Sequence, residues 1–123
     1  MTNAGSWFEI PVANYKRAKT FYATVLEIEV TDMPMGDTKY GVLPHNPEGH
    51  GIGGGIVEME DFKPSQEGTM VYLNGGEDLS EPLARIEAAG GKVVMPKTAI
   101  GENGFMAHFM DSEGNKVALH SMS

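Results

Sequence analysis

The chain has 123 residues, a length that is enough for one domain with a hydrophobic core and too short for two independent domains. Of these residues 41% are hydrophobic and 21% are charged. Its formal net charge of −8 disfavours nucleic acid as a partner, since nucleic-acid-binding proteins usually carry a basic patch. The absence of cysteine excludes disulfides, thiolate-bound zinc and thiol catalysis. We expect a cytoplasmic protein with no membrane partner, because neither a signal-peptide pattern nor an apolar run of roughly 20 residues occurs.

The first half of the chain predicts a strand, a helix and three further strands between Trp7 and Glu58. Residues 7–12 alternate as a strand does and run directly into residues 14–26. In that second segment apolar residues recur at the spacing of an amphipathic helix, with Asn14 as its N-cap. The apolar positions are Ala18, Phe21, Tyr22, Val25 and Leu26. The remaining strands are expected at 28–35, 38–44 and 53–60.

The second half repeats the same order of elements after a linker at residues 61–68. A strand at 69–74 precedes a helix expected over 78–90, with Asp78 and Glu81 at capping-box spacing. Glycine at positions 90 and 91 ends the helical pattern. The following strands are expected at 92–100, 105–111 and 115–121.

The two halves are offset by a nearly constant number of residues. Trp7 corresponds to Met70, 63 positions later, and Ile56 corresponds to Ala118, 62 positions later. In such a duplication each unit buries its hydrophobic face against its twin. We therefore expect one domain over residues 1–123, built from two βαβββ modules at 7–58 and 69–121.

Three segments of the chain carry a resemblance to a known family. Residues 10–26 hold a valine, a short polar turn and a helix with Phe-Tyr; residues 86–93 and 109–121 match in order and spacing. The chain resembles the vicinal oxygen chelate superfamily, which includes glyoxalase I, extradiol dioxygenases, fosfomycin-resistance proteins and bleomycin-binding proteins. The resemblance implies an α+β, glyoxalase-like fold in which tandem βαβββ modules form a curled mixed sheet around a cavity. It also implies a small-molecule ligand and a homodimer.

The residues at the family's metal positions depart from its pattern. Metal-dependent members place His or Glu ligands in the first and last strands of each module. The corresponding residues here are Trp7, Ile56, Met70 and Ala118, and none of them is a good ligand for a hard divalent ion. The resemblance therefore implies a cavity without the usual metal site, and the cofactor stays open, with a divalent metal unsupported at these positions.

A polar set is expected two residues further along the same strands. Side chains at i and i+2 share a face of a strand, so Glu9, Glu58, Tyr72 and His120 are predicted to face the cavity together. Such a set suits metal binding, acid–base chemistry or simple hydrogen bonding to a ligand. We predict Glu9 and His120 as catalytic residues, and His108 as a structural histidine. The predicted cavity wall consists of Trp7, Glu58, Met70, Tyr72 and Ala118.

Two functions of different class remain open at this point. One is a non-catalytic binder of an amphipathic small molecule, favoured by the apolar metal positions. The other is an enzyme, a lyase, isomerase or dioxygenase relative that uses Glu9 and His120 with or without a displaced metal. The two are distinguished by whether Glu9 lies within reach of His120.

Overall fold

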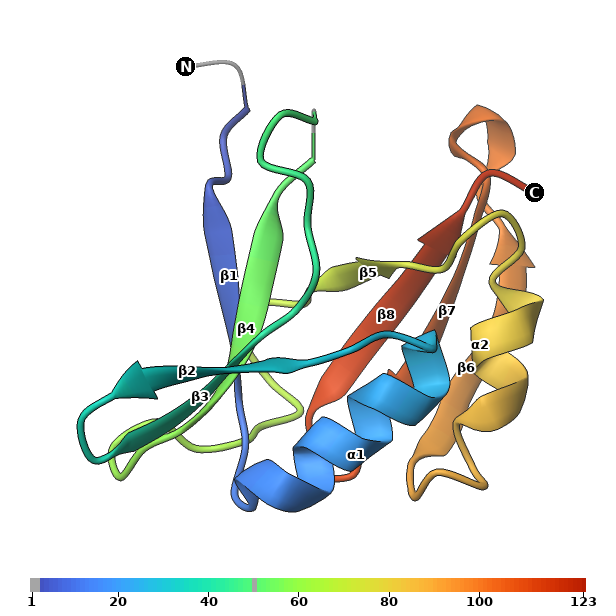
Figure 1. Ribbon diagram of the computed structural model, residues 1–123. Coiled ribbons are helices and arrows are strands. Elements are labelled where there is room, and N and C mark those ends of the chain that lie inside the picture. Colours follow the sequence, from blue (N-terminus) through green and yellow to red (C-terminus); the bar gives the residue numbers. More distant parts are fainter. Residues whose placement is uncertain (1–2, 50) are drawn as a thin grey trace.

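The computed structural model describes residues 3–49 and 51–123, which form two four-stranded sheets and two α-helices (Figure 1). The elements of the first half are β1 (Trp7–Pro11), α1 (Tyr15–Leu26), β2 (Thr31–Met35), β3 (Thr38–Val42) and β4 (Gly53–Glu58). Those of the second half are β5 (Tyr72–Asn74), α2 (Ser80–Arg85), β6 (Lys92–Ala99), the 3₁₀ turn η1 (Gly101–Asn103), β7 (Phe105–Met110) and β8 (Lys116–Ser121). In the part of the chain so described, no helix is long and apolar enough to span a membrane.

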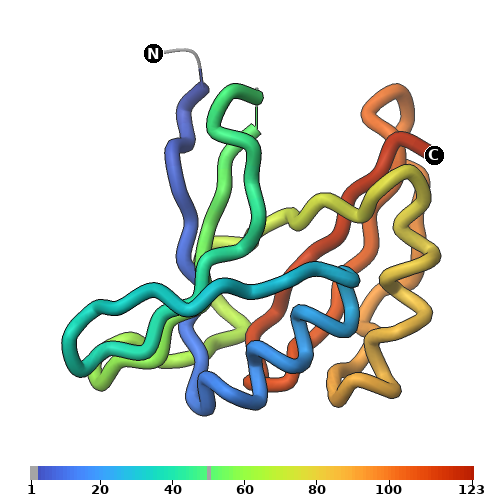
Figure 2. Tube along the Cα trace, in the orientation of Figure 1, coloured from blue at the N-terminus to red at the C-terminus, as the bar shows by residue number. Residues whose placement is uncertain are grey.

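The two sheets have the same topology, which confirms the predicted α+β fold of tandem βαβββ modules. Sheet 1 has the strand order β1-β4-β3-β2 and sheet 2 the order β5-β8-β7-β6. In each sheet the first strand of the module pairs in parallel with the last, and the other pairs are antiparallel. The strands form two separate mixed sheets, whose ribbons diverge from the end of the molecule that carries α1 (Figure 2).

Helix α1 belongs to the first module but packs against both. Its predicted apolar stripe is buried except for the partly exposed Leu26, and its Phe21 ring lies 6.2 Å from the ring of Phe109 on β7. Both aromatic side chains are almost completely buried. This packing joins the modules into one core, because each sheet alone would leave its apolar face in water.

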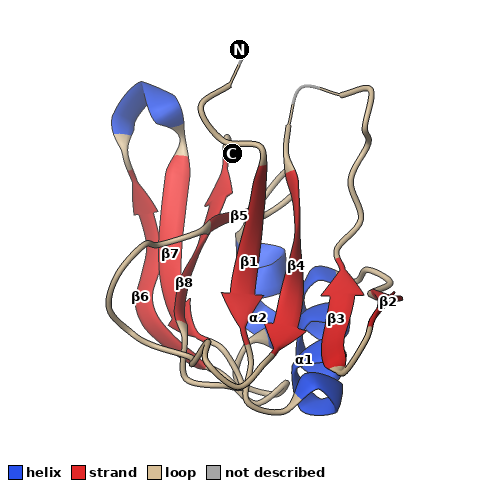
Figure 3. Ribbon diagram, turned by 90° about the vertical axis from the view of Figure 1, so that its left-hand side faces the viewer, coloured by secondary structure: helices blue, strands red, loops and turns tan. Residues whose placement is uncertain are grey.

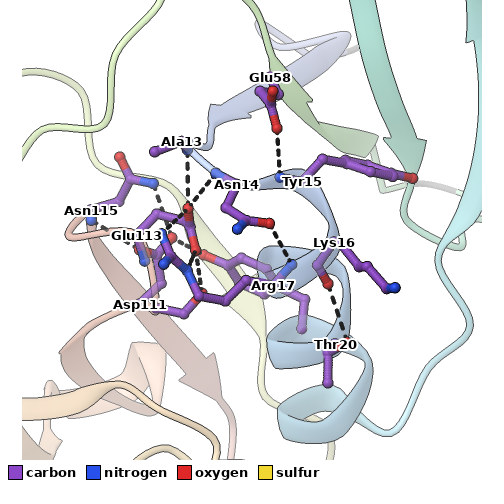
Figure 4. A network of polar contacts seen from close by, with 12 residues as sticks. Ala13, Asn14, Tyr15, Lys16, Arg17, Thr20, Glu58, Asp111, Glu113 and Asn115 are labelled. Atoms are coloured by element: carbon purple, nitrogen blue, oxygen red, sulfur yellow. Dashed lines mark hydrogen bonds and ion pairs between the residues drawn. The ribbon is translucent and has the colours of Figure 1, made fainter.

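The N-terminus of α1 is fastened to the turn between β7 and β8 by hydrogen bonds (Figure 4). The Asn14 side chain accepts from the backbone N–H of Arg17, which confirms the predicted N-cap. Across the modules, Oε1 of Glu113 accepts from the backbone N–H groups of Ala13 and Asn14 at 3.0 and 2.8 Å. The same carboxylate binds the Arg17 guanidinium at 2.7 Å, with 0% of its own side chain exposed. The first free N–H groups of the helix thus find a charged acceptor.

We expect the stability contributed by Glu113 to depend on pH. Burial alone would raise the pKa of this carboxyl, but hydrogen bonds from Arg17, Asn14 and Ser112 outweigh it and hold the pKa below its ordinary value of 4.5. Because the folded chain binds this proton more weakly than the unfolded chain, the contribution is present above about pH 4.5 and is lost as the pH falls through the lowered pKa.

Urea unfolding of the wild type and of Glu113→Gln at several pH values measures this contribution. We expect the variant to be about 1–2 kcal/mol less stable at pH 7 and the difference to shrink in acid. A difference that stays constant down to pH 3 would show that the carboxylate charge is irrelevant.

Helix α2 is shorter than predicted. It spans Ser80–Arg85, and residues up to Gly90 continue as turns. The predicted capping box is also wrong, because Oδ1 of Asp78 accepts from the N–H of Ser80 and from Lys97 on β6. The Lys97 contact and the Ser80 bond lower the pKa of Asp78 to about 2. A tertiary ion pair has taken the place of the local cap.

Candidate functional site

Each sheet has one face packed against the helices and one face without a helix, which we call its open face. In Figure 3 both helices lie behind β1, β4 and β3, so the strands are seen from the open side of sheet 1. On β1 the buried Ile10 belongs to the helix side, so the alternation of the strand places Trp7 and Glu9 on the open face. Their register partners on β4 are Gly53 and Gly55.

The register places Glu58 on the other face of sheet 1, so the prediction that it shares a face with Glu9 is wrong. Glu9 lies opposite Gly55, and Glu58 is three residues beyond that glycine, an odd step that reverses the direction of the side chain. The Glu58 carboxylate instead accepts from the backbone N–H of Tyr15 at the start of α1 (Figure 4). Ile56 lies on the same helix-facing side, fully buried opposite Ile10.

The open face of sheet 1 carries an aromatic and acidic cluster. Nε1 of Trp7 donates a hydrogen bond of 2.7 Å to the Tyr40 hydroxyl, which β3 supplies. Burial first, and then the neighbouring Glu9 carboxylate, raise the pKa of Tyr40. The ring of His45 meets Trp7 edge-on at 5.3 Å. Trp7 and Glu9 were predicted, whereas Tyr40 was missed because its strand carried no signal for which face it would present.

The open face of sheet 2 carries a second cluster. Tyr72 on β5 lies opposite Ala118 on β8, and His120 is two residues beyond that alanine on the same face. These three predicted residues are therefore brought to one face. Nε2 of His120 lies 2.6 Å from the carbonyl oxygen of Asn103 in η1. The histidine that had been predicted as catalytic thus has a partner in its own module.

His108 on β7 lies opposite Ala118 and so also faces the open side of sheet 2. Its ring is 6.3 Å from that of Tyr72, in a T-shaped contact. The Nε2 atom of His108 is buried and has no hydrogen-bond partner among the described residues. The prediction of a structural histidine with its hydrogen bonds satisfied is therefore wrong for this atom. Burial and, to a smaller extent, the charge of Lys116 lower the pKa of His108.

Glu9 and His120 lie in different sheets of the chain, and each has neighbours in its own module. Among the described residues, no hydrogen bond or ion pair joins the two. Glu9 lies beside Tyr40, and His120 contacts Asn103. Within the described chain the two residues thus have separate polar partners and no direct contact with each other.

A cleft between the modules has a volume of about 870 Å³. Of the predicted site residues it includes Met70 and Tyr72. Charged groups lie along it at the end of α1 and on α2, namely Glu27, Glu81 and Arg85. Its apolar lining comes from both modules and consists of Phe8, Leu26, Ile28, Leu43, Ile52, Met70, Val71, Leu73 and Pro82.

The residues at the open faces do not fit a divalent metal. Beside Trp7, strand β4 presents glycines, and beside Tyr72, strand β8 presents Ala118. The described residues contain no group of three or more His, Asp or Glu side chains placed to hold a metal ion. Hard divalent ions need several oxygen or nitrogen ligands at one point, so no step of a reaction is assigned to a metal here.

Comparison with known proteins identifies relatives of this fold. A sequence model described as Glyoxalase/Bleomycin resistance protein/Dioxygenase superfamily matches residues 6–119. A glyoxalase I mutant from Zea mays is similar in structure with a TM-score of 0.72 at 19% identity, over 94% of this chain and 46% of that chain. The chain thus spans about half the length of the maize protein. Comparison with curated proteins finds no significant match.

Two further solved structures are similar over nearly their whole length. The fosfomycin resistance protein FosX from Listeria monocytogenes has a TM-score of 0.67 at 14% identity, over 100% of this chain and 93% of that chain. A glyoxylase/bleomycin resistance protein/dioxygenase domain from Frankia sp. EAN1pec has a TM-score of 0.72 at 14% identity, over 98% of both chains. At these identities the likeness describes the fold alone.

Proposed function

Since this chain belongs to the glyoxalase/bleomycin resistance/dioxygenase superfamily, we propose that it binds an amphipathic small molecule in the cleft between its modules, without a metal. The observation that carries the proposal is the cleft itself. Its volume of about 870 Å³ lies within the range of roughly 300–1,000 Å³ that small-molecule sites occupy, and its walls are mainly apolar.

The charges along the cleft favour a cationic group on the ligand. Nε of Arg85 is already bonded to the carbonyl oxygen of Val25 at 2.9 Å, and its guanidinium lies 3.7 Å from Glu27. Glu81 adds a second carboxylate, and among the described residues it forms no ion pair. The net charge of −8 would also attract a cation during its approach. The proposed ligand therefore has an apolar body and a positively charged end.

Calorimetric titration with octyltrimethylammonium and with octyl sulfate, both below their micelle concentrations, tests this function. We expect the cation to bind more tightly, and Ile52→Ser to weaken its binding about tenfold by removing apolar contact. Ile52 is 43% exposed at the cleft, so the variant is expected to fold. Met33→Ser on β2 is the matched control, because Met33 is 38% exposed and lies outside the cleft. Equal weakening by both variants would contradict the proposal.

The enzyme remains the second candidate, favoured by one observation. Glu9 and His120 both lie on open faces, which a second copy of the chain can cover. This candidate relies on the homodimer that the family resemblance implies, because no hydrogen bond or ion pair joins the two residues among the described residues of one chain. It predicts that Glu9→Gln and His120→Gln abolish turnover of glyoxalase or dioxygenase substrates and leave the binding of octyltrimethylammonium unchanged. A monomer in light scattering would remove this candidate without affecting the cleft.

A further inference from the structure

Tyr72 lies across the small side chain of Ala118 and covers His108. The three residues form one row on the open face of sheet 2, since Ala118 is the register partner of Tyr72 on one side and of His108 on the other. Ala118 fills little of the row, so the ring of Tyr72 reaches the imidazole in a T-shaped contact of 6.3 Å. The cover is itself 51% exposed to solvent.

The cover is held only weakly. Its hydroxyl donates to the sulfur of Met106 at 3.6 Å, and a thioether is a poor acceptor. Beside it, Nε2 of His108 is buried with no hydrogen-bond partner in the described part of the chain, an arrangement that disfavours the covered state by leaving a polar atom unsatisfied. A half-exposed ring above an unsatisfied nitrogen can move aside at little cost.

The groups around His108 favour an acceptor at this position. Partial burial of the imidazole and the positive charge of Lys116 on β8 both favour the neutral form of His108. The neutral ring has one nitrogen lone pair available to accept a hydrogen bond. His120 on β8 and Lys92 on β6 are further titratable groups of this face, and β6 also contributes Met95 as the register partner of His108. Met95 and Met106 provide soft, adaptable walls that suit an aromatic ring.

We propose that Tyr72 is a movable cover over His108, and that Nε2 of His108 accepts a hydrogen bond from the hydroxyl of a small phenol when the cover opens. The ligand ring takes the place of the Tyr72 ring, which is itself a phenol. The ligand hydroxyl donates to Nε2 of His108, whereas the Tyr72 hydroxyl donates to the sulfur of Met106. This site adjoins the cleft proposed for the amphipathic ligand, because Tyr72 also lines that cleft, whereas His108 does not line it.

Titration of the full chain, with its histidine rings labelled with ¹⁵N, by 4-fluorophenol tests the proposal. We expect the resonances of His108 to shift and those of His45 to stay constant. His108→Phe removes the acceptor and keeps an aromatic ring, and it should weaken phenol binding about tenfold. Unshifted His108 resonances in the wild type would overturn the proposal even if this variant failed to fold.

Modification of His108 by diethyl pyrocarbonate measures the cover separately. Tyr72→Ala should speed the reaction several-fold, whereas Tyr72→Phe keeps the ring and should react like the wild type. An unchanged rate in Tyr72→Ala would show that Tyr72 is not the cover. Binding of 4-fluorophenol that is lost in Ile52→Ser and kept in His108→Phe would place the phenol in the cleft, and so would overturn this site while supporting the proposed function.

Discussion

Asp111→Ala is expected to lower the free energy of unfolding by about 3–5 kcal/mol, because it removes a buried carboxylate that joins the two modules. Asp111 is 4% exposed at the end of β7. Its Oδ2 accepts from the Tyr22 hydroxyl of α1 at 2.6 Å and from Nδ2 of Asn115 at 2.9 Å. Its Oδ1 accepts from the backbone N–H groups of Glu113 and Asn115. Alanine would leave all four donors without this acceptor.

The hydrogen-bond partners of Asp111 explain why its replacement would destabilise both modules. Tyr22 is completely buried, and burial followed by the charge of Asp111 raises its pKa well above the ordinary value, so its hydroxyl stays a neutral donor. Asn115 also donates to the carbonyl oxygen of Pro11 at the end of β1. The same carboxylate therefore holds the turn that carries Glu113 in position to cap α1 (Figure 4).

Urea unfolding of three variants separates these contributions. Asp111→Asn keeps an acceptor for the backbone donors and should lower the free energy of unfolding less than Asp111→Ala does. Tyr22→Phe removes one hydrogen bond and should lower the free energy of unfolding by about 1 kcal/mol. If Asp111→Ala cost no more than Tyr22→Phe, the turn would be held by its backbone alone and the proposed role of the carboxylate would be wrong.

Phe109→Ala is expected to lower the free energy of unfolding by about 3–5 kcal/mol through loss of buried apolar surface and formation of a cavity. Phe109 is completely buried on β7 and packs against Phe21 of α1. Phe21 in turn meets Tyr22 edge-on at 5.0 Å, so the cavity would open at the centre of the contact between modules. Neighbouring side chains that are fixed by the sheets cannot fill it without strain.

A matched control for this variant is Phe62→Ala. Phe62 lies in the linker between the modules and is 36% exposed, so its truncation should cost less than about 1 kcal/mol. Urea or thermal unfolding of both variants measures the difference. A loss of less than 1 kcal/mol in Phe109→Ala would mean that the core relaxes around the cavity and that α1 is not the joint of the two modules.

The fold was predictable because the helices and strands follow short periodic patterns of apolar residues in the sequence. The stripe from Ala18 to Leu26 repeats at the helical period, and each strand is bounded by glycine, proline or polar turns. The duplication then predicted the same topology twice, and the two sheets confirm it. The cap of α2 was not predictable from its pattern, because Asp78 is bound by Lys97, a residue 19 positions away.

The candidate site was predictable only in part. Alternation along β1 and β8 correctly placed Trp7 with Glu9 and Ala118 with His120, since residues two apart on a strand share a face. The pairing register between neighbouring strands was not predictable. Glu58 faces α1, because register depends on which backbone groups pair, and a shift of one residue reverses every side chain.

By itself, then, the sequence determined the order of the elements, the duplication and the family. Only the tertiary structure decided which side chains share a face, where the cleft lies and which polar atom is left without a partner. Tyr40 joins Trp7, and Tyr72 covers His108, through contacts between residues more than 30 positions apart. Local periodicity carries no information about such contacts, because they are set by strand pairing and by the packing of α1 between the modules.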